Sequence, residues 1–243
     1  MIILSVGMPR AGSGWHYNLI RDLMATTGCA DARDIRRRYR LQGILTAVNC
    51  NIGVLSLRRL AMVMLPSQLG NTFVIKAHAS PTIWARALIN LGLVRATYIY
   101  RDPRDAMLSA YEYGQRGLKR GKPNAFSFLK DFETALDFMM EYVRGWAKWI
   151  QCKRVLHVRY EGLLTDYDGE SARLLAFLGL DGKNEAVCAV IEQYRPGKLQ
   201  EGQQGLHFYK GQTGRFRQKF TPEQQETLAQ KFGPYLQWMG YDL

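Results

Sequence analysis

The segment from Ser5 to Trp15 constrains the fold of this chain more than any other. It follows the apolar run Met1 to Leu4 and precedes a helical pattern, which is the position of a phosphate-binding loop between a strand and a helix. Its glycines let the backbone approach an anion closely, and they are Gly7, Gly12 and Gly14. Arg10 and Ser13 add a positive charge and a hydroxyl donor. The segment predicts a site for a phosphorylated nucleotide, with a strand-to-helix turn that binds nothing as the alternative.

The loop lacks the residues that hold a nucleoside triphosphate with magnesium. A loop of that kind reads Gly-x4-Gly-Lys-Ser/Thr, and its lysine contacts the terminal phosphates while its hydroxyl binds the metal. Here Gly7 and Gly12 have the required spacing, but Ser13 and Gly14 follow in place of the lysine and the hydroxyl. A kinase or an ATPase is therefore disfavoured.

The composition favours a soluble, globular chain. Hydrophobic residues make up 47% of it, but apolar runs such as Ile2 to Val6 are far too short to span a bilayer. The first residues show neither the basic segment nor the cleavage site of a secretory signal, so we expect a cytoplasmic location. The four cysteines lie far apart without the spacing of a zinc site, and we expect free thiols in a reducing compartment.

The formal net charge of +12 predicts attraction to anionic partners. Nucleic acid is not expected, because the basic residues are dispersed rather than interleaved with aromatic residues along one stripe. The densest cluster, which consists of Arg33, Arg36, Arg37, Arg38 and Arg40, is equally well explained as a solvated face. An anionic substrate and peripheral contact with an anionic membrane surface are both open.

Short β-branched or aromatic runs alternate with helical patterns, which predicts an α/β fold with a central parallel sheet and helices on both faces. Besides the first run, strands are expected at Phe73 to Lys76, Ala96 to Tyr100 and Val155 to Val158. Helices are expected at Trp15 to Thr26, Thr82 to Leu91, Pro103 to Tyr113, Phe126 to Trp149, Ser171 to Leu178, Glu185 to Gln193 and Pro222 to Phe232. Mobile loops are expected at Gly114 to Asn124 and Arg195 to Thr213. No repeat or linker divides the sequence, so we expect one P-loop-like nucleotide-binding domain over residues 1–243.

Ligands of such a sheet bind beyond the carboxyl ends of its strands. The second predicted strand ends in Lys76-Ala77-His78, so its lysine and its histidine project to the same side in extended geometry. A histidine can remove a proton from an acceptor hydroxyl, and a neighbouring lysine can neutralise charge that builds on a leaving or bridging oxygen. The pair is a candidate for catalysis, and a histidine that only caps a strand end is the alternative.

The third predicted strand ends at Arg101, and the helix after it begins with Asp102-Pro103 as N-cap and first residue. Ser109 lies about two turns along this helix. An arginine fork with a serine hydroxyl suits a second phosphate group, distinct from the one at the first loop. The neighbouring pair Arg104-Asp105 is expected to be a surface or helix-end ion pair.

Five motifs in order resemble those of the nucleotide-dependent sulfotransferases, and together they span nearly the whole chain. They are Pro9-Arg10-Ala11-Gly12-Ser13-Gly14-Trp15, then Lys76-Ala77-His78, then Arg101 with Ser109, then Val158 to Leu164 ahead of Ala176 to Leu180, and finally Lys210 to Phe216 before Phe220-Thr221.

This resemblance implies transfer of a sulfuryl group from 3′-phosphoadenosine 5′-phosphosulfate to a hydroxyl or an amine, which leaves adenosine 3′,5′-bisphosphate and needs no metal. It also implies roles for individual residues. The loop from Arg10 to Trp15 would hold the 5′-phosphosulfate. The 3′-phosphate would be held by Arg101, Ser109, Lys210 and Gly211, and Tyr160 would lie near the nucleotide. His78 would be the general base, and Lys76 and Arg10 would stabilise the sulfuryl group during transfer.

The chain departs from the family pattern at several positions. Arg10 stands where the family usually has lysine. The guanidinium of arginine spreads its positive charge over a planar fork of donors, whereas the ammonium of lysine is a compact point charge. Ser13-Gly14 replaces a pair of threonines, Tyr209 stands where a basic residue often precedes the lysine, and Arg215-Phe216 replaces an acidic residue and tryptophan. Two other functions are open: a non-catalytic, basic module that binds a nucleotide or polyanion, and a metal-dependent phosphotransferase.

The sequence does not identify the acceptor, which we expect to be a small molecule, a lipid or a saccharide. Its pocket is expected in loops, and these are Asp31 to Arg40, Asn49 to Leu65, Gly114 to Asn124 and Arg195 to Phe208. The aromatic residues that could line it are Trp84, Tyr111, Tyr113 and Phe208, although aromatic residues more often belong to the core.

Overall fold

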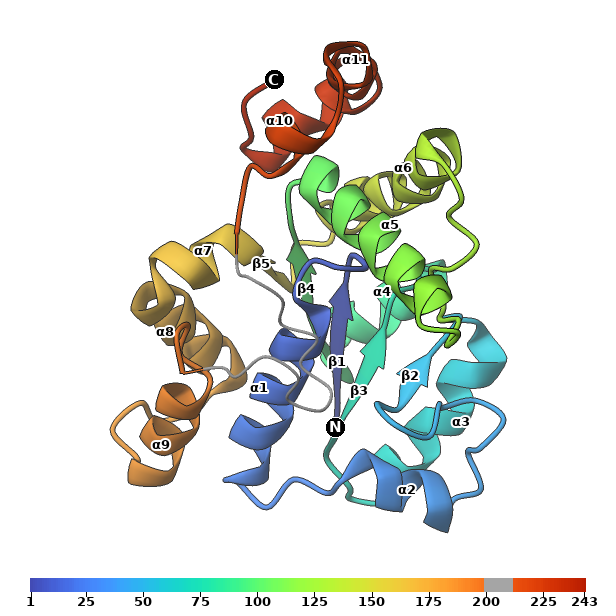
Figure 1. Cartoon of the computed structure of the whole chain (residues 1–243). Coiled ribbons are helices and arrows are strands. Elements are labelled where there is room, and N and C mark those ends of the chain that lie inside the picture. The colour runs from blue at the N-terminus through green and yellow to red at the C-terminus, as the bar shows by residue number, and fades with distance from the viewer. Residues whose placement is uncertain (199–211) are drawn as a thin grey trace.

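The computed structural model describes residues 1–198 and 212–243. Within them, one sheet of five parallel strands has the order β2-β3-β1-β4-β5 (Figure 1). The strands are β1 (Ile2–Gly7), β2 (Asn51–Ile52), β3 (Phe73–Ala77), β4 (Val94–Tyr100) and β5 (Val155–Arg159). The helices are α1 (Ser13–Ala25), α2 (Ala32–Arg38), α3 (Leu57–Gln68), α4 (Ile83–Asn90), α5 (Pro103–Lys119), α6 (Phe132–Trp149), α7 (Tyr160–Thr165), α8 (Tyr167–Leu178), α9 (Glu185–Gln193), α10 (Phe216–Lys219) and α11 (Pro222–Met239).

The central strand, β1, is buried along its whole length, as a continuous apolar run in a parallel sheet should be. It pairs with β3 on one side and β4 on the other, and Ser5 faces Lys76 of β3 and Thr97 of β4 in the register. The chain first builds the β3 side of the sheet and then crosses to the β4 side. Such a change of direction leaves a crevice at the carboxyl ends of the strands.

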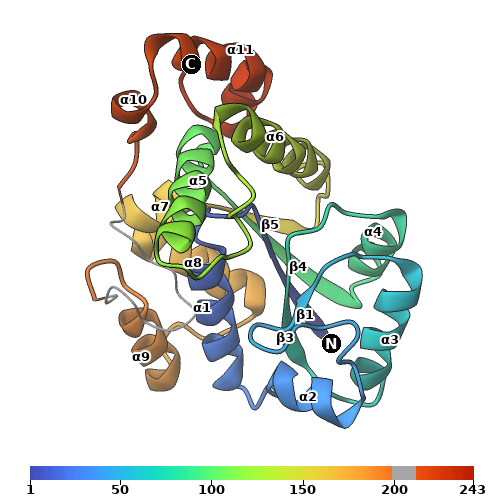
Figure 2. The same ribbon diagram turned by 45° about the vertical axis from the view of Figure 1, so that its right-hand side comes forward.

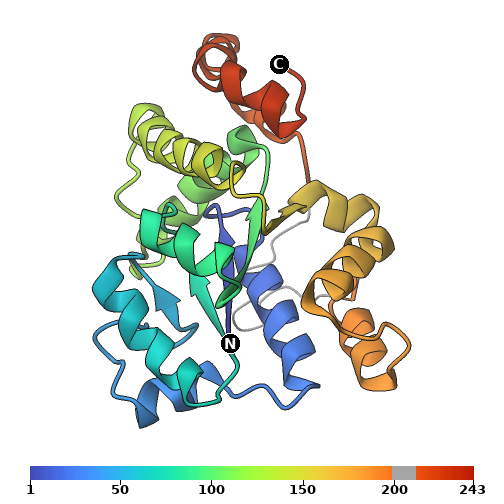
Figure 3. The same cartoon turned by 180° about the vertical axis from the view of Figure 1, so that it is seen from behind.

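Helices cover both faces of the sheet. Alternate side chains of β1 point to opposite faces, so Leu4 belongs to a core that α4, α6 and α11 help to form, while Ile3 belongs to a second core with α1, α8 and α9. Figure 1 looks onto the face that carries α1, and Figure 3, the view from behind, brings α4 and α6 forward. The expected fold class, a central parallel sheet with helices on both faces, is confirmed.

The expected loop from Gly114 to Asn124 is partly wrong, because α5 continues to Lys119. Its glycines were interpreted as loop residues, but they allow close packing inside a helix. A Cβ atom at Gly114 would lie 2.2 Å from the carbonyl oxygen of Phe126, and one at Gly117 would lie 2.3 Å from the Nδ2 of Asn124. The chain that returns from α5 therefore lies directly on this helix.

Other boundaries also differ from expectation. The helix expected to begin at Phe126 begins at Phe132, where Asp131 and Thr134 form a capping box. Five short or irregular elements were not predicted, and they are α2, β2, α3, α7 and α10. The expected loop from Arg195 to Thr213 lies largely outside the described residues.

All four cysteines are free thiols, as expected. None of the helices within residues 1–198 and 212–243 combines the length and the hydropathy needed to cross a bilayer.

Candidate active site

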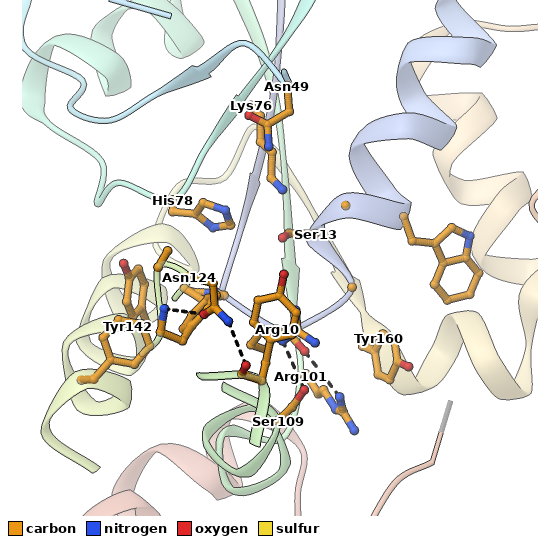
Figure 4. A pocket seen from close by; sticks show the side chains of 18 residues that line it. Arg10, Ser13, Asn49, Lys76, His78, Arg101, Ser109, Asn124, Tyr142 and Tyr160 are labelled. Atoms are coloured by element: carbon orange, nitrogen blue, oxygen red, sulfur yellow. Dashed lines mark hydrogen bonds between the residues drawn. The ribbon is translucent and has the colours of Figure 1, made fainter. Parts of the chain in front are cut away.

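A cavity of about 400 Å³ opens where β1, β3 and β4 end (Figure 4). It is lined by residues predicted from the first loop, from the end of β3 and from the start of α5, which are Arg10, Gly12, Ser13, Gly14, Trp15, Lys76, His78, Arg101 and Ser109, together with Tyr160 of α7. Ala11 does not line the cavity and packs into the core beneath the loop. Lys210 and Gly211 lie outside the described residues.

The loop after β1 has a backbone that few residue types accept. Gly12, the N-cap of α1, has a φ of 77°, and a Cβ atom there would lie 2.7 Å from the Cδ2 of Tyr160. Arg10 has a φ of 63°, which is uncommon for a residue with a side chain and typical of functional sites that store strain. The loop thereby turns the first backbone amides of α1 toward the cavity, where an anion would be stabilised.

The side chain of Arg10 connects this loop to α5. Its Nε donates a hydrogen bond to the Oγ of Ser109 at 3.2 Å, and its guanidinium carbon lies 4.5 Å from the centre of the Tyr113 ring. Burial lowers the pKa of Arg10 to about 10, so the guanidinium is charged at neutral pH. A positive charge therefore lies between the two regions predicted to bind phosphate groups.

Lys76 is 6% exposed, and it takes part in none of the ion pairs among the described residues. Its pKa is lowered to about 8, first by burial and then by the positive charge of Arg10. A buried ammonium group without a carboxylate partner is costly, and an anion in the cavity would offset that cost.

His78 is held in one tautomer by the backbone of β1. Its Nδ1 lies 2.6 Å from the carbonyl oxygen of Gly7, and because a carbonyl only accepts, Nδ1 carries the proton. Nε2 is then the atom with the free lone pair. The pKa of His78 is lowered to about 4, first by burial and then by the charge of Lys76, so the ring is neutral at pH 7. A neutral imidazole in a fixed orientation can accept a proton.

Arg101 is buried and touches several groups at once. It lies with its guanidinium carbon 4.6 Å from the centre of the Tyr160 ring, and its Nη2 donates to the carbonyl oxygen of Gln212 at 2.7 Å. Its Nε is buried and has no hydrogen-bond partner among the described residues. A second anion in the cavity would give this buried donor a partner.

The prediction that Arg104 and Asp105 form a surface or helix-end pair is wrong. They are 3% and 2% exposed, and each has a partner other than the neighbour. Arg104 pairs with Asp102 at 2.9 Å, while Asp105 accepts hydrogen bonds from the backbone amides of Gly214 at 2.5 Å and Phe216 at 3.1 Å. The reason is that the chain from residue 212 onward returns across the start of α5 and buries it.

Only part of the opposite wall of the cavity was expected, because Asn49 and Asn124 belong to two of the segments predicted to form the acceptor pocket, whereas its apolar residues were not singled out. Asn49 and Asn124 contribute amide groups to it, and the apolar part consists of Phe126, Phe138 and Tyr142. Figure 4 shows Tyr142 and Asn124 on the side of His78, and Tyr160 on the other side. Phe138 and Tyr142 are spaced as neighbours on one helix face, a pattern that by itself does not distinguish a cavity wall from the core.

The four aromatic residues expected in the acceptor pocket lie in different places. Tyr113 lines the cavity, whereas Tyr111 lines a smaller one between α5 and α10. Trp84 is 47% exposed on α4, and Phe208 lies outside the described residues.

Among the residues that the structure describes, no group of three or more histidine, cysteine, aspartate or glutamate side chains is arranged to hold a metal ion.

Comparison with known proteins gives a match over nearly the whole chain. A family model described as the sulfotransferase domain matches residues 2–240. Sulfotransferase 2B1 of Rattus norvegicus is 27% identical over 158 residues, which are 57% of this chain and 46% of that protein. Sulfotransferase 2B1 of Homo sapiens is 23% identical over 185 residues, which are 68% of this chain and 50% of that protein. The chain thus spans about half the length of the curated relatives it matches.

Solved structures share the fold. Mouse sulfotransferase SULT7A1 complexed with PAP has a TM-score of 0.62 at 18% identity, over 97% of this chain and 84% of that one. Retinol dehydratase in complex with androsterone and the inactive cofactor PAP has a TM-score of 0.59 at 17% identity, over 100% of this chain and 82% of that one.

Proposed function

The chain belongs to the sulfotransferase domain family, and from this premise we propose that it transfers a sulfuryl group from 3′-phosphoadenosine 5′-phosphosulfate to a hydroxyl or amine of a small acceptor. One observation carries the proposal. A single cavity holds a phosphate-type loop, a buried lysine without a carboxylate partner, a second arginine site, and a histidine whose tautomer leaves Nε2 free.

The residues around the cavity fit such a donor. The amides at the start of α1, with Ser13 and Lys76, would hold the 5′-phosphosulfate. Arg101 and Ser109 would hold the 3′-phosphate, since a second charged group fits the unsatisfied Nε of Arg101. By likeness to the family, Lys210 and Gly211 would contact the same phosphate. Two separated anion subsites suit this donor better than they suit a triphosphate.

The donor supplies a sulfuryl group whose bond to the 5′-phosphate oxygen breaks as a bond forms between sulfur and the acceptor oxygen or nitrogen. His78 takes the acceptor proton on Nε2, while its Nδ1 stays bonded to Gly7. Lys76 and Arg10 stabilise the negative charge that develops on the bridging oxygen.

The acceptor is proposed to have an apolar body with a hydroxyl or amine at one end. Phe126, Phe138 and Tyr142 line the cavity and would surround that body, and Tyr142 lies on the side of His78 (Figure 4). The related retinol dehydratase has been crystallised with androsterone and with retinol, which are molecules of that kind. The free thiols suit a reducing compartment, so we place the reaction in the cytoplasm.

Donor turnover tests this proposal. The protein is incubated with the donor and pools of phenols, aliphatic alcohols and saccharides, with and without a strong chelator, and products are searched by mass for an added sulfate. We expect sulfated products with apolar acceptors in both conditions. Donor binding without any product would indicate a binding module, and activity that needs magnesium would indicate a phosphotransferase.

A further inference from the structure

The charges of this protein are unevenly distributed along the chain. It has 21 acidic residues, but none of them lies between residues 35 and 101. That segment holds ten of the 33 basic residues, and these are Arg36, Arg37, Arg38, Arg40, Arg58, Arg59, Lys76, Arg86, Arg95 and Arg101. Most of the net charge of +12 thus comes from one stretch that forms α2, α3, α4 and the strands between them.

Exposed apolar side chains gather in the same stretch. Among the described residues, fourteen large hydrophobic side chains are exposed, and ten of them lie between residues 48 and 93. They are Val48, Val54, Leu57, Met62, Leu65, Leu69, Ile83, Trp84, Leu91 and Leu93. Single exposed apolar residues are ordinary, but a concentration of them in one region indicates an interaction site.

These side chains are close in space as well as in sequence. Helices α3 and α4 contact each other and lie side by side in Figures 2 and 3. The starts of the two helices are joined by Thr82, the N-cap of α4, whose Oγ1 donates to the carbonyl oxygen of Leu55 just before α3 at 2.6 Å. Leu57, Ile83 and Trp84, which are 51%, 74% and 47% exposed, therefore lie around one point on the surface.

Arginines border this apolar region. Arg58 is exposed on α3, next to Leu57. The end of α2 is tied to the turn after α3, because the Nδ2 of Asn71 donates to the hydroxyl of Tyr39 at 3.1 Å. The C-terminal end of α2, with Arg38, thereby lies beside the turn that follows α3. We call the exposed residues of α2, α3 and α4 the α2–α4 surface.

We propose that the α2–α4 surface binds the surface of an anionic phospholipid bilayer. Arginines attract an anionic leaflet, exposed leucine and isoleucine enter the acyl boundary, and tryptophan favours the headgroup level. Residues 35–101 hold no acidic residue, and the one acidic residue of the surface, Asp34 of α2, is paired with Arg37, so an anionic partner meets little repulsion. The exposed apolar side chains favour a bilayer over nucleic acid or another soluble polyanion, because a soluble polyanion binds through the charges alone. The inference does not depend on the proposed reaction.

The chain that connects α2 to α3 reaches the cavity. Val48 is 76% exposed, and its neighbour Asn49 lines the cavity. A bilayer bound here would therefore lie next to one edge of the candidate active site.

Vesicle co-sedimentation of the 243-residue chain tests the proposal. We expect binding to vesicles of phosphatidylcholine with phosphatidylserine, much weaker binding to phosphatidylcholine alone, and loss of binding at high salt. Arg58→Gln should weaken binding by roughly fivefold, the usual effect of one cation near an anionic leaflet. The double variant Ile83→Ser with Trp84→Ser should weaken it at every salt concentration. Matched controls away from this surface, Leu118→Ser and Lys130→Gln, are both exposed and should bind like the parent.

Tryptophan fluorescence gives a second measurement. The chain has five tryptophans, of which Trp15, Trp146 and Trp149 are buried, while Trp84 and Trp238 are exposed. In a Trp238→Phe background, anionic vesicles with brominated acyl chains should shift the emission to the blue and quench it. The further change Trp84→Phe should remove both effects.

Three results would overturn the proposal. The first is equal binding to neutral and anionic vesicles without salt dependence. The second is no vesicle binding but self-association, in sedimentation equilibrium, that the Ile83 and Trp84 changes abolish, which would assign the surface to a second copy of the chain. The third is binding to heparin and to vesicles that ignores the Ile83 and Trp84 changes, which would indicate a general polyanion site.

Discussion

Arg101 and Asp105 lie four residues apart and hold the same returning segment, with 3.7 Å between the Nη2 of the arginine and the Oδ2 of the aspartate. Arg101 binds the carbonyl of Gln212, and Asp105 binds the amides of Gly214 and Phe216. The aspartate therefore fixes the arginine of the second anion subsite and the chain that covers it at the same time.

Asp105→Asn should weaken this arrangement without changing the size of the side chain. The asparagine side chain lacks the negative charge beside Arg101 and has one acceptor oxygen where aspartate has two. One backbone N–H of the returning segment therefore loses its acceptor, which lowers the unfolding free energy by about 1 to 3 kcal/mol. The specific effect is on ligand preference. Calorimetry should show a smaller ratio of affinities for adenosine 3′,5′-bisphosphate over adenosine 5′-phosphate. The control Glu112→Gln alters the partner of Arg215 and should leave that ratio unchanged.

Arg101→Ala should remove most of the preference for the bisphosphate, because the charge-assisted bonds lost to the 3′-phosphate are each worth about 1.5 to 3 kcal/mol. Arg101→Lys should restore only part of it, since an ammonium cannot offer the two parallel donors of a guanidinium. Equal affinity of the unaltered protein for the two nucleotides would refute the second subsite.

His78→Ala should lower the transfer rate by roughly 100-fold or more and leave donor affinity nearly unchanged, because a general base acts on the acceptor proton. The loss should be larger for an aliphatic alcohol than for an acidic phenol. His78→Asn is the sharper variant, since its amide can still donate to the carbonyl of Gly7 but cannot accept a proton. If the asparagine variant keeps the parental rate with alcohols, His78 has only a structural role.

The pH profile of kcat/KM should fall on the basic side, with an apparent pKa near 8. Lys76 is charged below this pKa and neutral above it, so its contribution to charge stabilisation is largely present at pH 7 and is lost as the pH rises through 8. Lys76→Arg should abolish this limb, because an arginine stays charged. A profile that stays flat to pH 10 in the parent would exclude Lys76 from the reaction.

Gly12→Ala should impair donor binding more than a matched change elsewhere. Gly12 and Gly28 share a φ of 77°, so alanine strains the backbone equally at both, but only at Gly12 does the new Cβ meet the Tyr160 ring. Gly28→Ala has no atom within 4 Å of its new Cβ and should bind nucleotide like the parent. Similar nucleotide affinities for the two variants would show that the contact with Tyr160 does not matter.

The fold and the strand-end residues could be predicted because the information is local. A glycine-rich turn after an apolar strand, and polar residues at the ends of two further strands, must meet at one edge of a parallel sheet. Lys76, His78 and Arg101 were found in this way, and they do line one cavity.

Asp105 could not be interpreted in the same way, because its partners lie 109 and 111 residues further along the chain. Read locally, an aspartate after an arginine is an ion pair. The helix α3 was missed for another reason. Its buried residues Leu60, Val63 and Met64 have helical spacing, but apolar residues also occupy the exposed face and Pro66 lies within the helix, so the pattern is hidden in the sequence.

The close approach of Gly114 to the carbonyl oxygen of Phe126 means that a residue outside the cavity can affect which acceptors fit inside it. The ring of Phe126 lines the cavity, but its position is fixed by a missing methyl group on a neighbouring helix. An alanine at position 114 would push the backbone that carries the ring and reshape the cavity without changing a single residue that lines it. Relatives with identical cavity walls can therefore differ in the molecules they accept, and the cause would be a residue that does not contact the substrate.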